Sequence, residues 1–235
     1  DGDARRAIET ATGRPATIGS IEKMSKSKKN LVDPDDIIAH WGADCARWFM
    51  LPDSPPERDV IWTEAGVQGA GRFVQRVWRI VDELADRLPL DHAQTVPPVF
   101  GPEAMQLRRT THKALDAVGR NIEGLRFNVA VAQLYELTNA LQTALAQSSN
   151  KSSEDFDGAL REAAELLVQM IGPMMPHLAE ECWARLGYNT LLANVPWPAA
   201  DPALLVDDEI VIAVQVNGKR RDELKIARTA NSSEV

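Results

Sequence analysis

The feature that most constrains the fold is a long stretch of helical periodicity that covers residues 63–186 with few interruptions. Its first part, up to residue 88, carries apolar residues at steps of three and four, which places them on one face of an amphipathic helix. This seam consists of Val67, Ala70, Val74, Val77, Val81, Leu84 and Leu88. A helix with such a seam must bury it against other helices, so the pattern favours a helical bundle.

Further helical patterns follow the first one and complete the predicted bundle. They cover residues 105–118, 127–145, 159–170 and 177–186. Pro173 and Pro176 interrupt the pattern before the last helix, and Gly187 ends it, because proline cannot continue a helix and glycine tolerates the conformation of a helix end. We therefore predict a bundle of four or five helices over residues 63–198.

The segment before the bundle, residues 1–62, predicts a small α/β junction. Its first 19 residues are poor in large apolar side chains, which favours short strands or loops. Asp33 and Pro34 indicate a helix start, because aspartate caps the free N–H groups and proline fits the first helical position. A second short helix is predicted to begin near Asp44 and to end before Pro52.

The periodicity changes after the bundle. Residues 209–216 are rich in Val and Ile, Asn217 and Gly218 follow, and residues 219–226 form a second strand-like run. Asn-Gly between two such runs is a strong hairpin signal, because both residues tolerate positive φ. Residues 206–235 are therefore predicted to hold part of a further α/β domain with a β-hairpin, and the fold class is mainly α.

Composition excludes several classes of protein. Apolar residues make up 44% of the chain and charged residues 26%, which is typical of a folded globular protein. The formal charge of −8 excludes a uniformly basic surface for nucleic acid, although it permits local basic patches. Two cysteines exclude a disulfide framework and favour the cytoplasm, and no apolar run approaches the roughly 20 residues that span a bilayer.

A lysine-rich segment carries the clearest chemical motif. Its residues Lys23-Met24-Ser25-Lys26-Ser27 match the KMSKS signature of class I aminoacyl-tRNA synthetases. Residues 33–51, 66–81 and 214–219 resemble the leucyl-tRNA synthetase family, and residues 127–130 and 176–181 resemble bundle motifs of its isoleucine, valine and methionine relatives. The resemblance covers nearly the whole chain and implies that the bundle is a domain of the anticodon-binding type.

The resemblance implies a role for each residue of the signature. In amino-acid activation a carboxylate attacks the α-phosphate of ATP and pyrophosphate leaves, so a cation beside the phosphates lowers the barrier. By resemblance, Lys26 binds the phosphates and stabilises the transition state, and Lys23 is an ancillary cation. Met24 is expected to anchor the loop through apolar contact, while Ser25 and Ser27 bind phosphate or fix the loop.

The second signature of class I enzymes, His-Ile-Gly-His, does not occur around any of the four histidines. Both ends of the chain also resemble cuts in a longer sequence, so we expect a fragment that is inactive alone. Its longer parent is expected to be a monomer that binds leucine, tRNA(Leu) and ATP with Mg²⁺. We expect no metal site in the chain itself, because His177 and Glu181 lack a second pair of ligands.

Three basic clusters are candidates for contact with tRNA phosphates. They are Arg72, Arg76 and Arg79 in the first bundle helix, Arg108, Arg109 and Lys113 in the second, and Lys219, Arg220 and Arg221 after the hairpin turn. At about 100° per residue, the first three arginines span about 60° of arc opposite the apolar seam. A solvated polar face is the alternative. The resemblance also implies tRNA recognition largely at the elbow and long variable arm, partly through the C-terminal domain.

Two other functions compete with this interpretation. The first is another class I synthetase, specific for isoleucine, valine or methionine; the zinc cysteines of an isoleucine-type tail and the coiled coil of a valine-type tail are not visible here. The second is a non-catalytic helical module that binds RNA or protein. A protein-binding scaffold needs an exposed apolar stripe, whereas the stripes of this chain are expected to be buried within the bundle.

Overall fold

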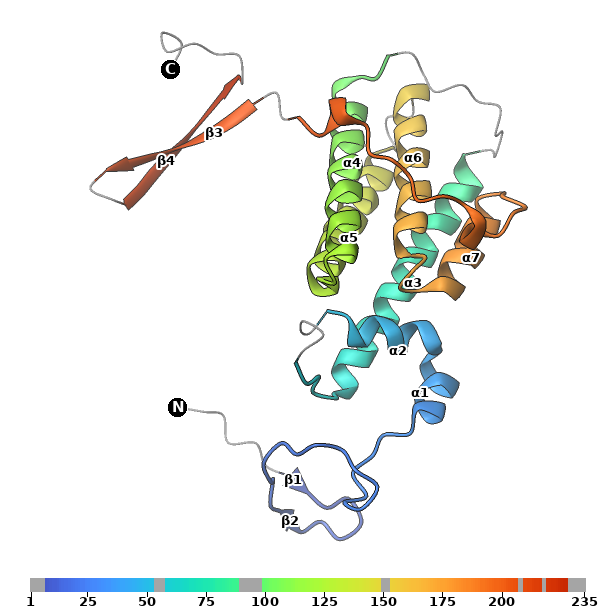
Figure 1. The fold of residues 1–235 in the computed structure, drawn as a ribbon, viewed down its shortest axis with the longest axis vertical. Helices are drawn as coiled ribbons and strands as arrows, with labels where there is room; N and C mark the ends of the chain where they lie inside the picture. Colours follow the sequence, from blue (N-terminus) through green and yellow to red (C-terminus); the bar gives the residue numbers. More distant parts are fainter. Residues whose placement is uncertain are drawn as a thin grey trace. The chain divides into compact units, whose positions relative to one another are not determined.

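The computed structural model describes residues 7–52, 58–88, 99–148 and 153–206, together with the backbone of residues 209–216 and 219–227. Over these ranges the chain is mainly helical, with two small two-stranded sheets, which confirms the predicted fold class (Figure 1). The chain divides into two compact units, residues 1–40 and residues 41–235. No helix in the described ranges has both the length and the apolar character needed to cross a bilayer.

The first unit contains a minimal sheet and a long loop. Strands β1 (Ala7–Ile8) and β2 (Pro15–Ala16) pair antiparallel, so of the short strands or loops predicted for this segment, both occur. The loop leads to helix α1 (Pro34–Trp41), where the Asp33 carboxylate accepts the N–H of Asp35 at 3.0 Å. The predicted helix start at Asp33 is therefore confirmed, because its side chain satisfies an N–H that has no partner inside the helix.

The second unit begins with a short helix that packs on the bundle. Gly42 adopts φ 83°, a conformation that glycine tolerates, and directly precedes helix α2 (Ala43–Met50). Asp44 of this helix is buried, and its Oδ2 accepts the backbone N–H of Leu178 at 2.7 Å. Leu178 lies in the first turn of helix α7 (Pro176–Arg185), so the Asp44 carboxylate joins α2 to the amino end of α7.

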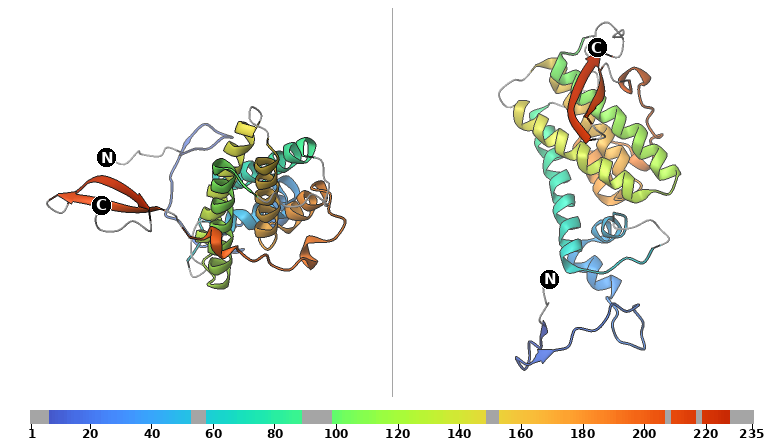
Figure 2. Two further views of the ribbon diagram at one scale, coloured as in Figure 1. Left: turned by 90° about the horizontal axis from the view of Figure 1, so that it is seen from above. Right: turned by 90° about the vertical axis from the view of Figure 1, so that its left-hand side faces the viewer.

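The predicted bundle helices are present, and most extend a few residues beyond the predicted ranges. They are α3 (Glu64–Arg87), α4 (Pro102–Glu123), α5 (Phe127–Ser148), α6 (Glu154–Ile171) and α7. Thr63 caps α3 by accepting the N–H of Gly66 at 3.1 Å. Figure 2 shows α4, α5 and α6 side by side, in agreement with their mutual contacts.

The core of the bundle is apolar and includes an aromatic cluster. Five residues of the α3 seam are buried, with Val77 and Val81 at 0% exposure, while Val74 and Leu88 are partly buried against the core. Trp48 of α2 is also at 0% exposure, stacks on Phe73 with 4.6 Å between ring centroids, and donates its indole N–H to the Tyr135 hydroxyl at 3.0 Å. This cluster links α2, α3 and α5, since each aromatic ring comes from a different helix.

The segment after α7 follows the bundle and leads to the C-terminal hairpin. Glu180 accepts the N–H groups of Leu192 and Ala193, at 2.8 and 2.9 Å, and so holds the 3₁₀ turn Leu192–Asn194. A second 3₁₀ turn, Pro202–Leu204, places Leu204 in a buried position.

The hairpin itself is confirmed. Strands β3 (Glu209–Val216) and β4 (Lys219–Ala227) pair antiparallel, with an irregularity in register between Val214 and Gln215. The predicted Asn-Gly turn lies outside the described residues. The domain limits 1–62, 63–198 and 206–235 stay a prediction.

Candidate functional site

The KMSKS segment forms a compact turn in the loop between β2 and α1. The Ser25 hydroxyl accepts the backbone N–H of Lys28 at 3.3 Å and lies 3.2 Å from the Ser27 hydroxyl. The carbonyl of Lys26 accepts the N–H of Lys29 at 3.2 Å, and Lys29 adopts φ 53°. Serine hydroxyls commonly close turns in this way, so the serines of the motif fix the loop in this structure.

An asparagine just after the motif also takes part in the loop. Asn30 Oδ1 accepts the N–H of Ser25 at 2.8 Å, and Asn30 Nδ2 donates to the Lys23 carbonyl at 3.4 Å. Asn30 is not among the site residues predicted from the sequence. The available signal was its type, because asparagine side chains often bond to nearby backbone groups in turns.

The lysines of the loop differ in their partners. Lys28 Nζ lies 2.7 Å from Glu22 Oε2, and both side chains are about half exposed. Lys23 and Lys26 are exposed and form no ion pair with any residue in the described part of the chain. The two lysines expected to bind phosphate therefore have no ion-pair partner among the described residues, and the exposed Lys29 shares this property.

Met24 does not have the apolar environment expected for an anchor. Its side chain is 40% exposed, and the unit formed by residues 1–40 supplies no buried cluster around it. The apolar contact expected of Met24 stays a prediction, because the described residues of this unit supply no buried side chain to receive it. The loop is held by hydrogen bonds instead.

The arginine stripe of α3 lies opposite the buried seam, as its spacing predicts. Arg72 and Arg79 are exposed, while Arg76 is partly buried, with its guanidinium carbon 5.6 Å from the centroid of the Phe73 ring. Arg76 Nε and Nη2 are buried without a hydrogen-bond partner among the described residues. Buried donors normally have partners, so these two nitrogens are unusual, and the Arg76 side chain would have to move before they could meet a phosphate from outside.

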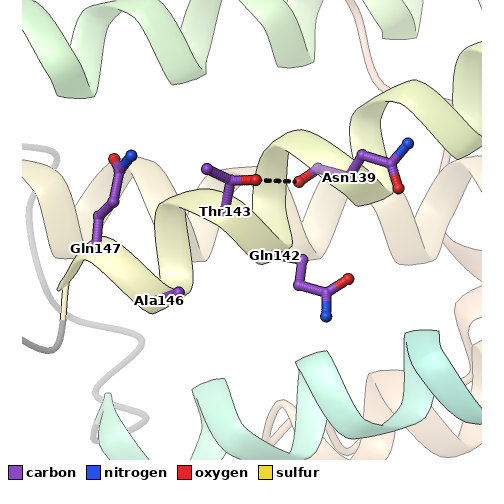
Figure 3. A pocket seen from close by; sticks show the side chains of 5 residues that line it. All are labelled: Asn139, Gln142, Thr143, Ala146 and Gln147. Carbon is purple, nitrogen blue, oxygen red and sulfur yellow. Dashed lines mark hydrogen bonds between the residues drawn. The ribbon is translucent and has the colours of Figure 1, made fainter.

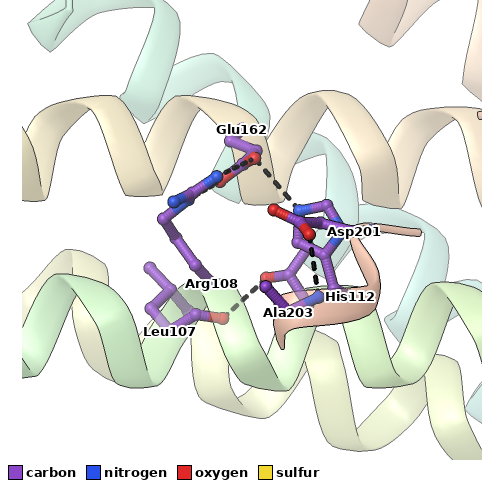
Figure 4. Close-up of polar contacts among 7 residues, drawn as sticks. Leu107, Arg108, His112, Glu162, Asp201 and Ala203 are labelled. Carbon is purple, nitrogen blue, oxygen red and sulfur yellow. Dashed lines mark hydrogen bonds and ion pairs between the residues drawn. The ribbon is translucent and has the colours of Figure 1, made fainter. Parts of the chain in front are cut away.

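The first residue of the second basic cluster is already bound within the bundle (Figure 4). Arg108 donates to both carboxylate oxygens of Glu162, at 2.6 and 3.1 Å, and its guanidinium lies 4.0 Å from the centroid of the Phe100 ring. Its side chain is only 14% exposed. A bidentate pair with a carboxylate uses the same donors that would bind a phosphate. This geometry favours a role for Arg108 in holding α4 to α6, and its proposed contact with tRNA is untested.

Glu162 also joins the segment after the bundle to this network. His112 Nε2 lies 3.1 Å from Glu162 Oε1, and His112 Nδ1 accepts the N–H of Asp201 at 3.0 Å. Burial raises the pKa of Glu162, but the hydrogen bonds and charges of His112 and Arg108 outweigh it and lower the pKa to about 2. The carboxylate is therefore ionised at neutral pH and ties α4, α6 and the 3₁₀ turn at residue 202 together.

The structure says less about the other basic residues proposed to contact tRNA, which lie on α4 and β4. Arg109 and Lys113 are both partly buried and take part in interactions within the protein. Lys219 and Arg220 open β4, opposite Val216 and Gln215, and Arg221 follows at the irregularity in register. The side chains of these three strand residues lie outside the described part of the structure, so their contact with tRNA stays a prediction.

A shallow hollow of about 670 Å³ runs along α5 (Figure 3). Its lining is uncharged and consists of Asn139, Gln142, Thr143, Ala146 and Gln147. The Thr143 hydroxyl donates to the Asn139 carbonyl at 2.9 Å, so it is used within the helix. Since no titratable side chain lines this hollow, it offers no acid, base or nucleophile for catalysis.

The described residues contain no group of three or more His, Cys, Asp or Glu side chains arranged to hold a metal ion. Both cysteines are buried, and burial raises the pKa of the Cys182 thiol to about 12. Cys182 therefore stays protonated at neutral pH and is unsuited to act as a nucleophile or metal ligand.

Comparison with known families gives a consistent result for both parts of the chain. Residues 105–235, more than half of the chain, match the family described as the anticodon-binding domain of tRNA ligase. Residues 19–63, which include the KMSKS loop, match the family of class I tRNA synthetases for I, L, M and V. The chain therefore belongs to the anticodon-binding-domain family of tRNA ligases.

Curated relatives that match this chain carry the name leucine–tRNA ligase. Proteins named leucine–tRNA ligase from Brucella ovis and Brucella canis are each 57% identical over 239 residues, covering 98% of this chain and 27% of the relative. The crystal structure of the ternary complex of Agrobacterium radiobacter K84 agnB2 LeuRS-tRNA-LeuAMS matches with a TM-score of 0.78 and 30% identity. That match covers 90% of this chain and 26% of the other. The expected resemblance to leucyl-tRNA synthetases is confirmed, and the chain spans about a quarter of the length of these relatives.

Proposed function

We propose that this chain supplies the KMSKS loop and a tRNA-binding helical bundle to a leucine–tRNA ligase, which activates leucine with ATP and transfers it to tRNA(Leu). The observation that carries the proposal is the loop itself, which presents Lys23 and Lys26 exposed and unneutralised while Lys28 is paired with Glu22. The leucine-specific relatives support the choice of amino acid.

The proposed role of the loop follows from the charge changes in the reaction. When the carboxylate of leucine attacks the α-phosphate, negative charge develops on the departing pyrophosphate. An ammonium placed there stabilises the transition state more than the ground state, and Lys26 supplies it, with Lys23 as a second cation. Mg²⁺, when bound with ATP, neutralises part of the phosphate charge. The serine hydroxyls are engaged in the turn, so their role is to hold the lysines in place.

The bundle is proposed to bind tRNA(Leu) through the phosphate backbone. Arg72 and Arg79 are exposed on α3, and the partly buried Arg76 lies between them, with two buried N–H donors that have no partner among the described residues. Arginine side chains on one helix face suit consecutive phosphates, because phosphate contacts need charge and donors but no base sequence. Contacts of this kind position the tRNA without reading its anticodon.

The proposal is tested with Lys26→Ala in the full-length enzyme, measured by leucine-dependent ATP–pyrophosphate exchange. Loss of one transition-state donor should lower kcat by on the order of 10²-fold. The KM for leucine should change little, because Lys26 is expected to contact phosphate and not leucine. Lys28→Ala is the matched control, since Lys28 is already paired with Glu22, and it should stay within about threefold of wild type.

Two results would contradict the proposal. Exchange by Lys26→Ala within threefold of wild type would remove the assigned role of the loop. Wild-type exchange that depends on isoleucine, valine or methionine in place of leucine would identify a different class I synthetase.

A further inference from the structure

We infer that Asn30 is a positioning residue for amino-acid activation, whose side-chain amide clamps the KMSKS loop by bridging the backbones of Lys23 and Ser25. This inference rests on the proposed function of the loop. Asn30 lies beyond the five-residue motif, and its side chain forms hydrogen bonds with backbone groups of Lys23 and Ser25.

The two bonds of Asn30 use both ends of its amide. Oδ1 accepts the Ser25 N–H at 2.8 Å, while Nδ2 donates to the Lys23 carbonyl at 3.4 Å. Lys23 and Ser25 flank Met24, so the amide holds the chain on both sides of that residue. Asparagine and glutamine alone have a side chain with adjacent amide donor and acceptor groups that can form such a bridge.

Two bonds to backbone groups of the loop are nested inside this bridge. Ser25 Oγ accepts the Lys28 N–H and the Lys26 carbonyl accepts the Lys29 N–H, and both bonds join residues that lie between Lys23 and Asn30. The asparagine therefore closes a ring that contains these two bonds and Lys26, while the side-chain ion pair of Lys28 reaches Glu22, one residue outside the ring.

The KMSKS loop has no apolar packing that could hold its conformation in place of the Asn30 hydrogen bonds. Every residue from 21 to 30 is exposed except Ser25, which is partly buried. In a loop without a buried side chain, the few side-chain-to-backbone bonds define the conformation. Removing Asn30 should therefore widen the range of backbone conformations that carry Lys26.

An ordinary turn role for Asn30 predicts different bonds. An asparagine that only stabilises its own turn bonds the backbone about two residues further on. Asn30 instead reaches back five residues to Ser25 and seven residues to Lys23. The span of these bonds connects the amide to the signature and not to the start of α1.

This clamp affects catalysis through preorganisation. A lysine held near the phosphates contributes to the rate only while the loop keeps it there, so greater loop freedom lowers kcat. Leucine binding does not depend on this loop under the proposed function. The expected signature of Asn30→Ala is therefore a fall in kcat with an unchanged KM for leucine.

The test uses the full-length enzyme with Asn30→Ala in ATP–pyrophosphate exchange and in limited digestion by trypsin, which cleaves after lysine. We expect kcat to fall about tenfold, a KM for leucine within twofold of wild type, and cleavage within residues 23–29 about tenfold faster. Asn139→Ala is the matched control, because Asn139 is an exposed asparagine on α5, and it should change neither measurement.

Asn30→Asp separates the two bonds. It keeps an oxygen that accepts the Ser25 N–H but loses the donor to Lys23, so cleavage by trypsin should lie between wild type and Asn30→Ala. Wild-type kcat and wild-type cleavage in Asn30→Ala would overturn the inference, and so would equal loss in Asn30→Ala and Asn139→Ala. Lys26→Ala, assayed in parallel, distinguishes the failures: if it slows exchange while Asn30→Ala does not, only the clamp is wrong.

Discussion

The KMSKS loop and the helical bundle are held together by opposite means. The loop is exposed and depends on hydrogen bonds between residues no more than seven positions apart. The bundle depends on buried side chains from distant parts of the chain, such as Trp48 and Tyr135, which are 87 residues apart. Substitutions in the loop should therefore alter activity with little effect on stability, whereas substitutions in the bundle core should lower stability.

The largest expected effect on stability comes from the aromatic cluster. Trp48→Ala in the 235-residue chain removes a fully buried ring between α2, α3 and α5, and should lower the free energy of unfolding by about 3–5 kcal/mol. Chemical denaturation measures this loss. Met24→Ala in the loop is the contrasting change and should cost no more than about 0.5 kcal/mol, because Met24 is exposed. Equal losses of unfolding free energy in the two variants would contradict the difference between loop and bundle.

The next effect is pH-dependent and concerns Glu162. Because its folded-state pKa is lowered from 4.5 to about 2, Glu162 contributes stability above pH 4.5 that is lost as pH falls towards 2. Glu162→Gln should cost about 2–3 kcal/mol at pH 7 and flatten the acid limb of the stability curve.

Denaturation at pH 7 and at pH 3 measures the contribution of Glu162. Glu136→Gln changes an exposed glutamate of α5 and serves as the control, with little change at either pH. A wild-type acid limb in Glu162→Gln would show that the network with Arg108 and His112 does not stabilise the bundle.

The arginine stripe lies on the bundle, but we expect its substitution to affect tRNA binding and to leave stability almost unchanged. Replacing Arg72, Arg76 and Arg79 together by Gln keeps helix propensity and should change stability by less than about 1 kcal/mol. In the full-length enzyme, the slope of log K for tRNA binding against log salt should fall by roughly two to three units. An unchanged slope would favour a solvated face and direct attention to the hairpin residues from Lys219 onward.

The smallest effect is expected at the ion pair beside the loop. Glu22→Gln removes the partner of Lys28, but both side chains are half exposed, so stability should change by about 0.5 kcal/mol or less. Exchange activity of the full-length enzyme should stay within about twofold of wild type. A tenfold loss of exchange would mean that Lys28 must be neutralised for the loop to act.

The helices were predictable because their determinants are local. The seam of α3 repeats at steps of three and four, and Val77 and Val81 are buried as this spacing requires. Asp33 and Pro34 likewise start α1 through groups within two residues of each other. The KMSKS motif could also be found directly, since it is five consecutive residues.

The partners of individual polar residues were decided by the tertiary structure. Arg108 is one of several similar arginines in the sequence, and only the packing of α4 on α6 brings it to Glu162, 54 residues away. The same packing gives His112 two partners, Glu162 and the N–H of Asp201. Charge and spacing along one helix do not contain this information, because the partner comes from another part of the chain.

The sequence by itself determined where the helices and the hairpin form and which five residues carry the signature, because periodicity, caps and motifs involve near neighbours. Only the tertiary structure decided that Arg108 holds α4 to α6, that Arg76 keeps unused donors beside Phe73, and that Asn30 closes the loop. The physical reason is that hydrogen bonds and ion pairs require atoms to meet within about 3 Å. Whether two polar atoms come that close depends on how the backbone folds and on which side chains lie next to each other.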